Sequence, residues 1–437
     1  MAGRDGGGYR GLGIKILERY GISVGDRIEV RTEENDISGV LMPRYESASE
    51  DYIVIKLKSG YNTGIQVDRI KSLRKLEKIK SSGLPKAQEI HDSKDLPRIS
   101  LISTGGTIAS KIDYRTGGVH AALSASELYA SVPELANHAS IDPEVLLSEY
   151  SENLKPEHWT VIADKVAEKV KSGKYRGVIV SHGTDTMHYT AGALSFALQG
   201  LPIPVVLVGA QRSSDRPSSD AATNLIGATV FASRSEYSGV FVAMHADTSD
   251  DSIACHVGTR VRKNHTSRRD AFESIDSIPV AFVRNGAVEM EKNEINLVKR
   301  SEGNLAPNSR FDSRVGLLKY YPGFDPKMID HASRSCKAII LEGTGLGHVS
   351  KECFPNIKKA IDSGVMVFMT SQCIWGRVSM TVYDTGRDLL NIGVIPLSDM
   401  ISEIALVKAM WSLANTKDAK KAMQENLANE ITASIPL

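Results

Sequence analysis

The first 85 residues contain short runs of alternating or β-branched apolar residues, separated by turn signals. Such runs lie at residues 22–31, 38–41, 51–57 and 61–67. The turn signals include Gly25-Asp26, Asn35-Asp36 and Ser59-Gly60. Several short strands at close spacing, joined by hairpin turns, are typical of a small all-β fold. We therefore predict a small β-barrel domain over residues 1–85.

A basic stretch ends this region. Residues 69–80 (RIKSLRKLEKIK) contain six basic residues and one acidic residue. Such a run either contacts RNA or forms a solvated face, and the solvated face is the commoner case. The polar segment after it contains helix and strand breakers, so we predict a linker at residues 86–96.

From residue 97 onward, buried-strand runs alternate with stretches of helical period. The expected strands lie at residues 98–103, 177–180, 205–209, 240–244, 338–341 and 365–370, and the expected helices at 159–171, 189–198, 220–232 and 357–363. This alternation is typical of a parallel α/β sheet with helices on both faces. A polar interruption at residues 293–314 predicts a boundary, which separates a larger domain (97–305) from a smaller C-terminal α/β domain (315–437).

Composition narrows the class of protein. The chain has 437 residues, which at about 150 residues per domain predicts two or three domains. Lys and Arg number 53 and Asp and Glu 52, so no global field attracts nucleic acid. No apolar run approaches the ~20 residues of a membrane helix, and the N-terminus lacks a signal-peptide core. Four cysteines without CxxC spacing favour a reduced, cytoplasmic protein.

Two turns that follow predicted strands carry unusual numbers of hydroxyl groups and glycines. TGGTIA occupies residues 104–109, and SHGTDTM occupies residues 181–187. Each turn alone is compatible with helix capping. Ligands of open α/β sheets collect at the carboxyl ends of strands. We therefore expect the two turns to surround one small polar ligand.

A threonine in these turns could act as a nucleophile if a base removes its proton. A lysine serves as that base where burial or a nearby cation lowers its pKa, and a carboxylate such as Asp185 could hold it in place. The segment GTRVRKNHTS (258–267) offers four candidates. They are Arg260, Arg262, Lys263 and His265. A solvated loop remains the alternative for this segment.

Four blocks resemble the signature motifs of the L-asparaginase/glutaminase family of amidohydrolases. They are TGGTIAS (104–110), VSHGTDTMHYTA (180–191), PVVLVGAQR (204–212) and VRKNHTS (261–267). The resemblance covers about residues 97–425 and implies an asparaginase-like core with the active site in its larger domain. The block ISVGDRIEV…GVLMPRY…DYIVIKLKSGYNTGI is absent from ordinary asparaginases. It resembles the leading domain of the D subunit of archaeal glutamyl-tRNA(Gln) amidotransferases, which narrows the resemblance to that family.

The resemblance also implies catalytic roles. Thr107 matches the threonine that attacks the side-chain amide carbon of the substrate. Thr184, Asp185 and Lys263 match the second threonine and its acid–base partners. Taken from the residues alone, Lys263 is one candidate in four.

Substrate-binding roles are implied in the same way. Ser151 and Glu152 match the pair that binds the α-carboxylate and α-amino groups of the substrate. A carboxylate such as Glu152 complements an ammonium group. Gly106 and Gly183 would let backbone N–H groups approach the substrate and stabilise an oxyanion.

The loop after the first turn departs from the family pattern. Asparaginases carry a tyrosine there that helps to activate the nucleophile. The loop at residues 111–124 has one tyrosine, Tyr114, which comes earlier than the usual spacing, and His120 lies nearer the expected position. Tyr114 is a candidate lid residue, with an exposed loop aromatic as the alternative.

The function implied is release of ammonia from glutamine or asparagine, for transamidation of Glu-tRNA(Gln) to Gln-tRNA(Gln). The resemblance implies a homodimer within an α2β2 complex, in which the partner is the E subunit of the amidotransferase. That partner would use ATP and Mg and contact most of the tRNA, so we expect no cofactor in this chain. A free-standing L-asparaginase/glutaminase is the first alternative, and a catalytically silent RNA-binding scaffold is the second.

Nucleotide and metal sites are not favoured. AIILEGTGLGH (338–348) has His348 where a dinucleotide fingerprint needs glycine, and no GxxxxGK[ST] motif occurs. His182, His188 and Asp185 could suggest a metal site, but the sequence offers no third ligand at a convincing spacing. The sequence therefore favours amide hydrolysis by the asparaginase-like motifs, without a metal.

Overall fold

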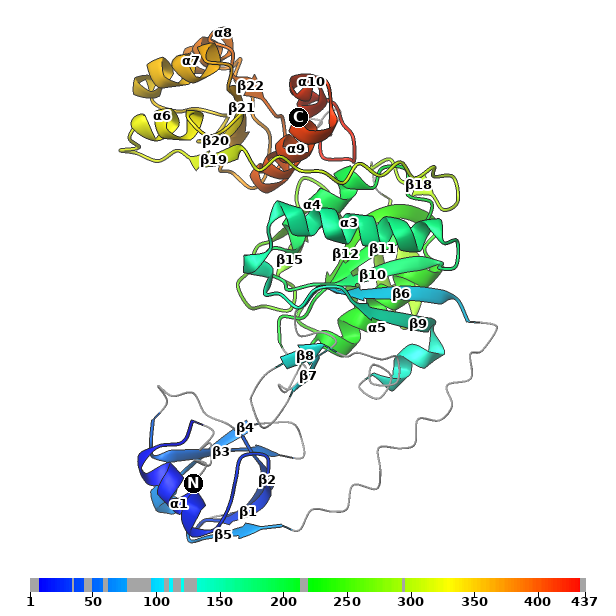
Figure 1. The fold of residues 1–437 in the computed structure, drawn as a ribbon, viewed down its shortest axis with the longest axis vertical. Coiled ribbons are helices and arrows are strands. Elements are labelled where there is room, and N and C mark those ends of the chain that lie inside the picture. Colours follow the sequence, from blue (N-terminus) through cyan, green and yellow to red (C-terminus); the bar gives the residue numbers. More distant parts are fainter. Residues whose placement is uncertain are drawn as a thin grey trace.

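A computed structural model describes residues 8–33, 35–42, 49–57, 62–76, 96–105, 110–112, 119–121, 132–212, 219–292 and 295–432. Figure 1 shows a small β-sheet domain with one helix, a larger α/β domain and a smaller α/β domain. Each has a hydrophobic core of its own. The predicted fold class is confirmed. All of the predicted linker except residue 96 falls outside the described residues.

The N-terminal β domain is one antiparallel sheet with the strand order β4-β3-β2-β1-β5. Its strands are β1 (Arg27–Arg31), β2 (Asp36–Leu41), β3 (Tyr52–Leu57), β4 (Asn62–Gln66) and β5 (Ser72–Lys75). Alternation decides the faces, because Ile28 and Val30 of β1 are buried while Arg27 and Arg31 face solvent. A 3-10 turn (Val67–Arg69) and the helix α1 (Gly11–Arg19), which the sequence pattern did not predict, complete it.

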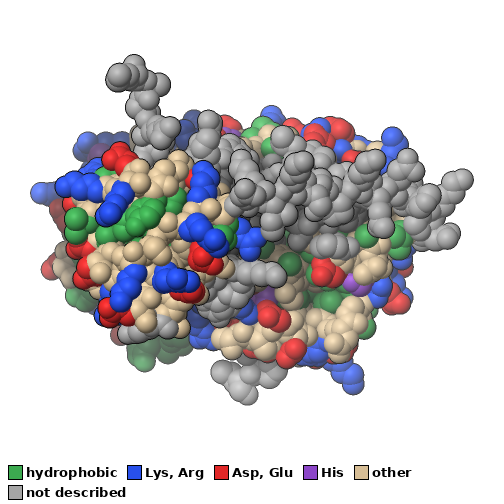
Figure 2. All heavy atoms as spheres, turned by 90° about the horizontal axis from the view of Figure 1, so that it is seen from below, with side chains coloured by type: hydrophobic (Ala, Val, Ile, Leu, Met, Phe, Trp, Pro, Cys, Tyr) green, Lys and Arg blue, Asp and Glu red, His purple; other side chains and the backbone are tan. Residues whose placement is uncertain are grey.

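The basic stretch at the end of this domain is paired with acidic side chains. The ion pairs are Lys71–Glu33 at 2.9 Å, Arg74–Glu29 at 3.1 Å and Lys75–Asp26 at 2.5 Å. Figure 2, seen from the side of this domain, shows Asp and Glu side chains among the Lys and Arg side chains. Such pairing supports the solvated-face interpretation for residues 71–75.

The larger α/β domain is built on a nine-stranded sheet. Five strands run parallel in the order β12-β11-β10-β6-β9. They are β12 (Tyr237–His245), β11 (Pro204–Val208), β10 (Gly177–Ser181), β6 (Arg98–Ser103) and β9 (Ser140–Val145). Alternate residues of these strands enter two separate cores, so α5 (Ala221–Arg234) packs on one face. The helices α3 (Pro156–Lys171) and α4 (Met187–Ala197) pack on the other.

The sequence pattern predicted a parallel sheet, but part of the sheet is antiparallel. Beyond β12, the strands β13 (Ile253–Val257), β16 (Ala281–Arg284) and β17 (Ala287–Met290) are antiparallel. Only residues 246–252 connect β12 to β13. A parallel crossover needs a dozen or more residues, so this short connection forces the chain to reverse.

Small elements complete this domain. They are β7 (Ser110–Ile112), β8 (Val119–Ala121), β14 (Val261–Lys263), β15 (Phe272–Ser274), β18 (Val298–Lys299) and the 3-10 turns Pro133–Asn137 and Ser151–Asn153. The pairs β7–β8 and β14–β15 are antiparallel, and β18 pairs with the start of β12.

The smaller α/β domain has a parallel sheet in the order β19-β20-β21-β22. Its strands are β19 (Val315–Lys319), β20 (Ala338–Gly343), β21 (Met366–Ser371) and β22 (Ile395–Pro396). Its helices are α6 (Lys327–Ser333), α7 (Phe354–Asp362), α8 (Asp384–Asn391), α9 (Ser402–Asn415) and α10 (Ala419–Gln424), with a 3-10 turn at Lys351–Cys353. Helix α9 packs against α4, so the two α/β domains share a core. None of the helices described is long and apolar enough to cross a membrane.

Two buried ion pairs lie at or beside the contact between the two α/β domains, and we call Arg260, Asp399, Lys408, Glu430 and Thr432 the interdomain seam. Arg260 Nη1 lies 3.0 Å from Asp399 Oδ2, and both side chains are almost fully buried. Thr432 Oγ1 donates to the same carboxylate at 2.6 Å. Lys408 pairs with Glu430, and both side chains are fully buried. The Arg260–Asp399 pair thus joins the segment before β14 to the smaller domain, whereas the Lys408–Glu430 pair lies within the smaller domain, between α9 and the segment after α10.

Candidate active site

The two predicted strand-end turns lie side by side. β6 and β10 are neighbouring parallel strands, and Ser103 is in register with Ser181 at their carboxyl ends. The backbone N–H and the hydroxyl of Thr104 both donate to the Ser181 carbonyl, at 3.1 and 2.9 Å. Parallel pairing therefore brings the start of the TGGT turn against the SHGTDT turn.

A third segment closes in on both turns. Gly105 has φ +122°, and a Cβ there would lie 2.1 Å from the backbone oxygen of Glu149, so only glycine fits. At Gly183, a Cβ would lie 2.8 Å from Cβ of Ser151. Thr186 Oγ1 donates to the Ser151 carbonyl at 2.7 Å. The segment that carries Ser151 is thus fitted to both glycines.

Ser151 and Glu152 differ in exposure. Both lie on the 3-10 turn Ser151–Asn153. Ser151 is buried, whereas Glu152 is exposed. An exposed carboxylate at the rim and a buried hydroxyl beside Gly183 are compatible with the substrate-binding roles implied for them. Those roles stay predictions.

Lys263 reaches this site from a different part of the chain. It lies on β14, and its Nζ donates to Thr184 Oγ1 at 2.9 Å and to Asp185 Oδ1 at 2.6 Å. The lysine side chain is only 9% exposed, whereas that of Asp185 is 66% exposed. The structure thus brings together one amine, one hydroxyl and one carboxylate from segments 79 positions apart.

The other three basic candidates of this segment have different partners. Arg260 belongs to the interdomain seam, and Arg262 Nε donates to Glu403 Oε1 at 2.8 Å. His265 Nδ1 accepts from the N–H groups of two following residues in an exposed turn. Of the four, Lys263 alone contacts Thr184. The solvated-loop alternative is wrong for Lys263, because its side chain is nearly buried.

Gly106, Thr107 and Tyr114 fall outside the described residues. Their positions relative to Thr184 and Lys263 stay predictions, as does the lid. Thr104 and Gly105, which directly precede Gly106, lie beside the turn that carries Thr184.

Two histidines of the SHGTDTMH motif lie beneath the site. Burial lowers the pKa of both His182 and His188 to about 4, so both are neutral at pH 7. Both ring nitrogens of His182 already face protein atoms. Across the described ranges, no group of three or more His, Cys, Asp or Glu residues could hold a metal ion.

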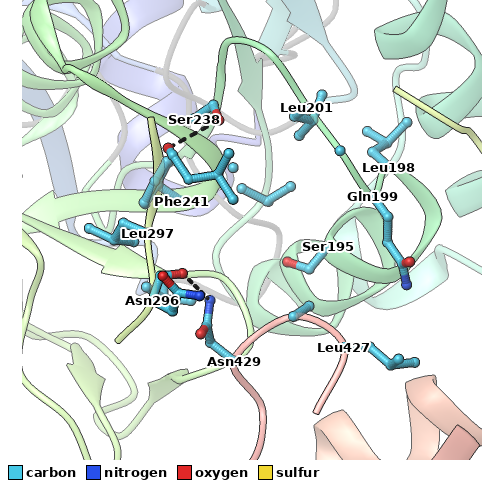
Figure 3. A pocket seen from close by; sticks show the side chains of 16 residues that line it. Ser195, Leu198, Gln199, Leu201, Ser238, Phe241, Asn296, Leu297, Leu427 and Asn429 are labelled. Atoms are coloured by element: carbon cyan, nitrogen blue, oxygen red, sulfur yellow. Dashed lines mark hydrogen bonds between the residues drawn. The ribbon is translucent and has the colours of Figure 1, made fainter. Parts of the chain in front are cut away.

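A cavity lies away from these residues, at the other end of the strands (Figure 3). It is lined by the end of α4, the start of β12 and the segments 296–298 and 427–429. The hydrogen bonds Ser238–Val298 and Asn429–Asn296, at 3.2 and 3.4 Å, cross its wall. None of the predicted site residues that the structure describes lines it.

Comparison with known proteins places the chain in a family. Residues 22–76 match the GatD N-terminal domain, 98–296 the N-terminal asparaginase domain and 314–425 the C-terminal domain of glutaminases and asparaginases. The D subunit of the glutamyl-tRNA(Gln) amidotransferase of Pyrococcus furiosus is 48% identical, over 96% of this chain and 97% of that protein. The chain belongs to the D-subunit family of glutamyl-tRNA(Gln) amidotransferases. The family predicted from the motifs is confirmed.

Other members and solved structures agree with this assignment. The corresponding D subunit of Methanopyrus kandleri is 46% identical over 97% of this chain and 94% of that protein. The L-asparaginase of Thermococcus kodakarensis superposes with a TM-score of 0.68 and 34% identity, and covers 77% of this chain and 100% of its own. L-asparaginase I of Vibrio cholerae has a TM-score of 0.67 and 28% identity, over 77% and 99%. The D-subunit relatives thus match nearly the whole chain, while the asparaginases match about three quarters.

Proposed function

We propose that this chain hydrolyses the side-chain amide of glutamine and supplies the ammonia for conversion of Glu-tRNA(Gln) to Gln-tRNA(Gln). The observation that carries the proposal is the contact of Lys263 with Thr184 and Asp185 at the carboxyl ends of β6 and β10. Family membership supports a role of Lys263, Thr184 and Asp185 in glutamine hydrolysis, because the D-subunit relatives match the chain over nearly its full length.

Thr107 is the proposed nucleophile. Its oxygen bonds to the carboxamide carbon, the C–N bond breaks, and ammonia leaves with the added proton. Water then cleaves the resulting ester and releases glutamate, which restores the hydroxyl. Thr184, Lys263 and Asp185 carry the protons in both steps, since the amine contacts both the hydroxyl and the carboxylate.

The surrounding residues orient the substrate. Ser151 binds its α-carboxylate and Glu152 its α-ammonium, which is a charge-assisted contact. Backbone N–H groups near Gly106 and Gly183 stabilise the oxyanion. Tyr114 lies on the loop that covers the substrate during the reaction.

A second protein, resembling the E subunit of the amidotransferase, completes the reaction as the partner of this chain. It activates Glu-tRNA(Gln) with ATP and Mg, makes most of the tRNA contacts, and receives the ammonia before bulk water protonates it. The proposed assembly is an α2β2 complex built on a homodimer of this chain, in the cytoplasm.

A free-standing L-asparaginase is the second candidate, favoured by the likeness of the α/β core to solved L-asparaginases. Hydrolysis of glutamine and of asparagine by the purified chain, alone and with the partner plus charged tRNA, separates the two. We expect glutamine hydrolysis to rise when the partner and tRNA are added. Asparagine hydrolysis that is strong and indifferent to the partner would contradict the proposal.

A further inference from the structure

His182 occupies the first position after β10, directly before Gly183 and Thr184. Its side chain is 1% exposed. Its backbone N–H extends the ladder to β11 by donating to the Val208 carbonyl at 2.9 Å. The imidazole is thus enclosed directly beneath the turn that carries Thr184.

The hydrogen bonds of His182 determine which nitrogen carries its proton. Nδ1 lies 2.7 Å from the Gly183 carbonyl oxygen. A carbonyl can only accept, so Nδ1 must be the protonated nitrogen. Burial lowers the pKa of His182 to about 4, so at pH 7 the ring has one proton and Nε2 is an acceptor.

The donor to Nε2 is a buried threonine on α4. Thr190 Oγ1 lies 2.9 Å from Nε2 of His182 and 3.2 Å from Nε1 of Trp159 on α3. An indole N–H can only donate, so Thr190 accepts from Trp159 and gives its own proton to His182. The three side chains form a chain of hydrogen bonds with one direction, from Trp159 through Thr190 and His182 to the Gly183 carbonyl.

This chain of hydrogen bonds fixes a peptide of the active site. A trans peptide is planar, so the direction of the Gly183 carbonyl also sets the Thr184 N–H, which points away from the imidazole. The same peptide sets the position of the Thr184 backbone, and the Thr184 hydroxyl contacts Lys263 at 2.9 Å. Ser151 packs closely against Gly183, where a Cβ would lie 2.8 Å from the Cβ of Ser151.

Resting on the glutaminase function proposed above, we propose that His182 is a positioning residue for amide hydrolysis. Through Nδ1 it holds the Gly183–Thr184 peptide, and Thr190 and Trp159 hold the imidazole. His182 touches neither substrate nor Lys263. Its effect is to keep Thr184 in place while the proton moves.

Two substitutions of His182 test this directly. In His182→Asn the amide nitrogen replaces Nδ1 and can still donate to Gly183, whereas in His182→Gln the amide replaces Nε2 and that donor is lost. Both variants lose the ring, and they differ from each other by one methylene group. We expect kcat to fall by on the order of 10²-fold in the Gln variant, with KM less changed, and by at least about tenfold less in the Asn variant. Equal kcat values in the two variants would overturn the proposal.

Substitutions of Thr190 form a second test. Thr190→Val removes the donor to Nε2 and should lower kcat, and Thr190→Ser should restore it. Thr229→Val is the matched control, because Thr229 is also a fully buried helical threonine, whose hydroxyl donates to the Leu225 carbonyl within α5. Its kcat should match that of the unaltered chain. A Thr190→Val variant with the same kcat as this control would contradict the proposal.

The tautomer provides a readout that does not depend on activity. With ¹⁵N-labelled histidine in the full chain, the signal absent from the His182→Gln variant should show a proton on Nδ1 and none on Nε2 between pH 5.5 and 8. A proton on Nε2 would overturn the proposed contact whatever the activity. An Nδ1–H signal in an intact complex that lacks glutaminase activity would instead refute the proposed function.

Discussion

Two lysine–carboxylate pairs of this chain have opposite surroundings. Lys263 and Asp185 meet at a strand end, and Asp185 is 66% exposed. Lys408 and Glu430 meet inside the interdomain seam, and neither side chain is exposed. Lys408 also donates to the carbonyl oxygens of Met423 and Glu425, so its three donors are all engaged within the protein.

The difference separates a reactive lysine from a structural one. The seam pair has a structural role, because burial lowers the pKa of Lys408 and the contacts with Glu430, Glu425 and the backbone carbonyls offset that cost. The site pair leaves one carboxylate in water and places the amine against a hydroxyl. A lysine whose partner is a threonine can exchange a proton there.

The largest expected effect is on catalysis. Lys263→Met removes the amine but keeps most of the side-chain volume, so glutamine hydrolysis should fall by about 10²–10⁴-fold. Stability should change by less than about 1 kcal/mol, because the exposed Asp185 is readily solvated once its partner is gone. Steady-state kinetics and thermal unfolding check the two values. A large loss of stability would show that Lys263, like Lys408, has a structural role.

Glu430→Gln should have the reverse profile. It leaves the buried Lys408 without its counter-charge, which costs about 3–5 kcal/mol of stability. The kcat of the folded protein should be retained. In the double variant Lys408→Met/Glu430→Leu, we expect much of that loss to be recovered, because no charge is buried. Calorimetry of both variants tests this, and an unchanged melting temperature in Glu430→Gln would contradict it.

Mild acid should weaken the larger α/β domain. Burial lowers the pKa of His182, His188 and His256 to about 4 from the ordinary 6.5. The unfolded chain therefore binds these protons first. The stability is present above pH 6.5 and is lost as the pH falls towards 4. Between pH 7 and 6, the three together should cost about 2 kcal/mol.

Denaturant unfolding at pH 7 and pH 6 measures this loss. The His256→Gln variant removes one of the three groups, so its pH dependence should be smaller by about a third. An unfolding free energy that stays constant between pH 7 and 6 would contradict the account.

The smallest effect is expected on the N-terminal β domain. Arg74 pairs with Glu29 at 3.1 Å, but its side chain is 71% exposed. Arg74→Ala should therefore cost about 0–1 kcal/mol. It should also leave tRNA binding by the complex unchanged, as filter binding at fixed salt can show. A clear loss of tRNA affinity would show that the basic stretch is an RNA contact.

The strands that carry the site could be predicted from the sequence alone. Predominantly apolar runs give β6, β10 and β11 to within one residue at each end, because strands buried on both faces are mostly apolar rather than alternating. Helix α1 could not be found in this way, since Gly11 and Gly13 disfavour a helix and interrupt its apolar period. The antiparallel half of the sheet depends on loop length, which the strand pattern does not contain.

The site could be predicted only in part. The polar strand-end turns indicated it, but the choice of Lys263 among four basic residues depends on a contact across 79 positions. Local sequence does not encode such a contact, and only the family motif indicated it. Trp159 and Thr190 fall within the predicted helices 159–171 and 189–198, but nothing in their spacing distinguishes a hydrogen-bonded side chain from a packed one.

The central claim is that a threonine hydroxyl of this chain releases the ammonia used for amidation. The most direct measurement compares formation of Gln-tRNA(Gln) by the complex of Thr107→Val with its partner, given either glutamine or an ammonium salt. The account predicts no product with glutamine and normal product with ammonium. Product from glutamine in this variant would contradict it.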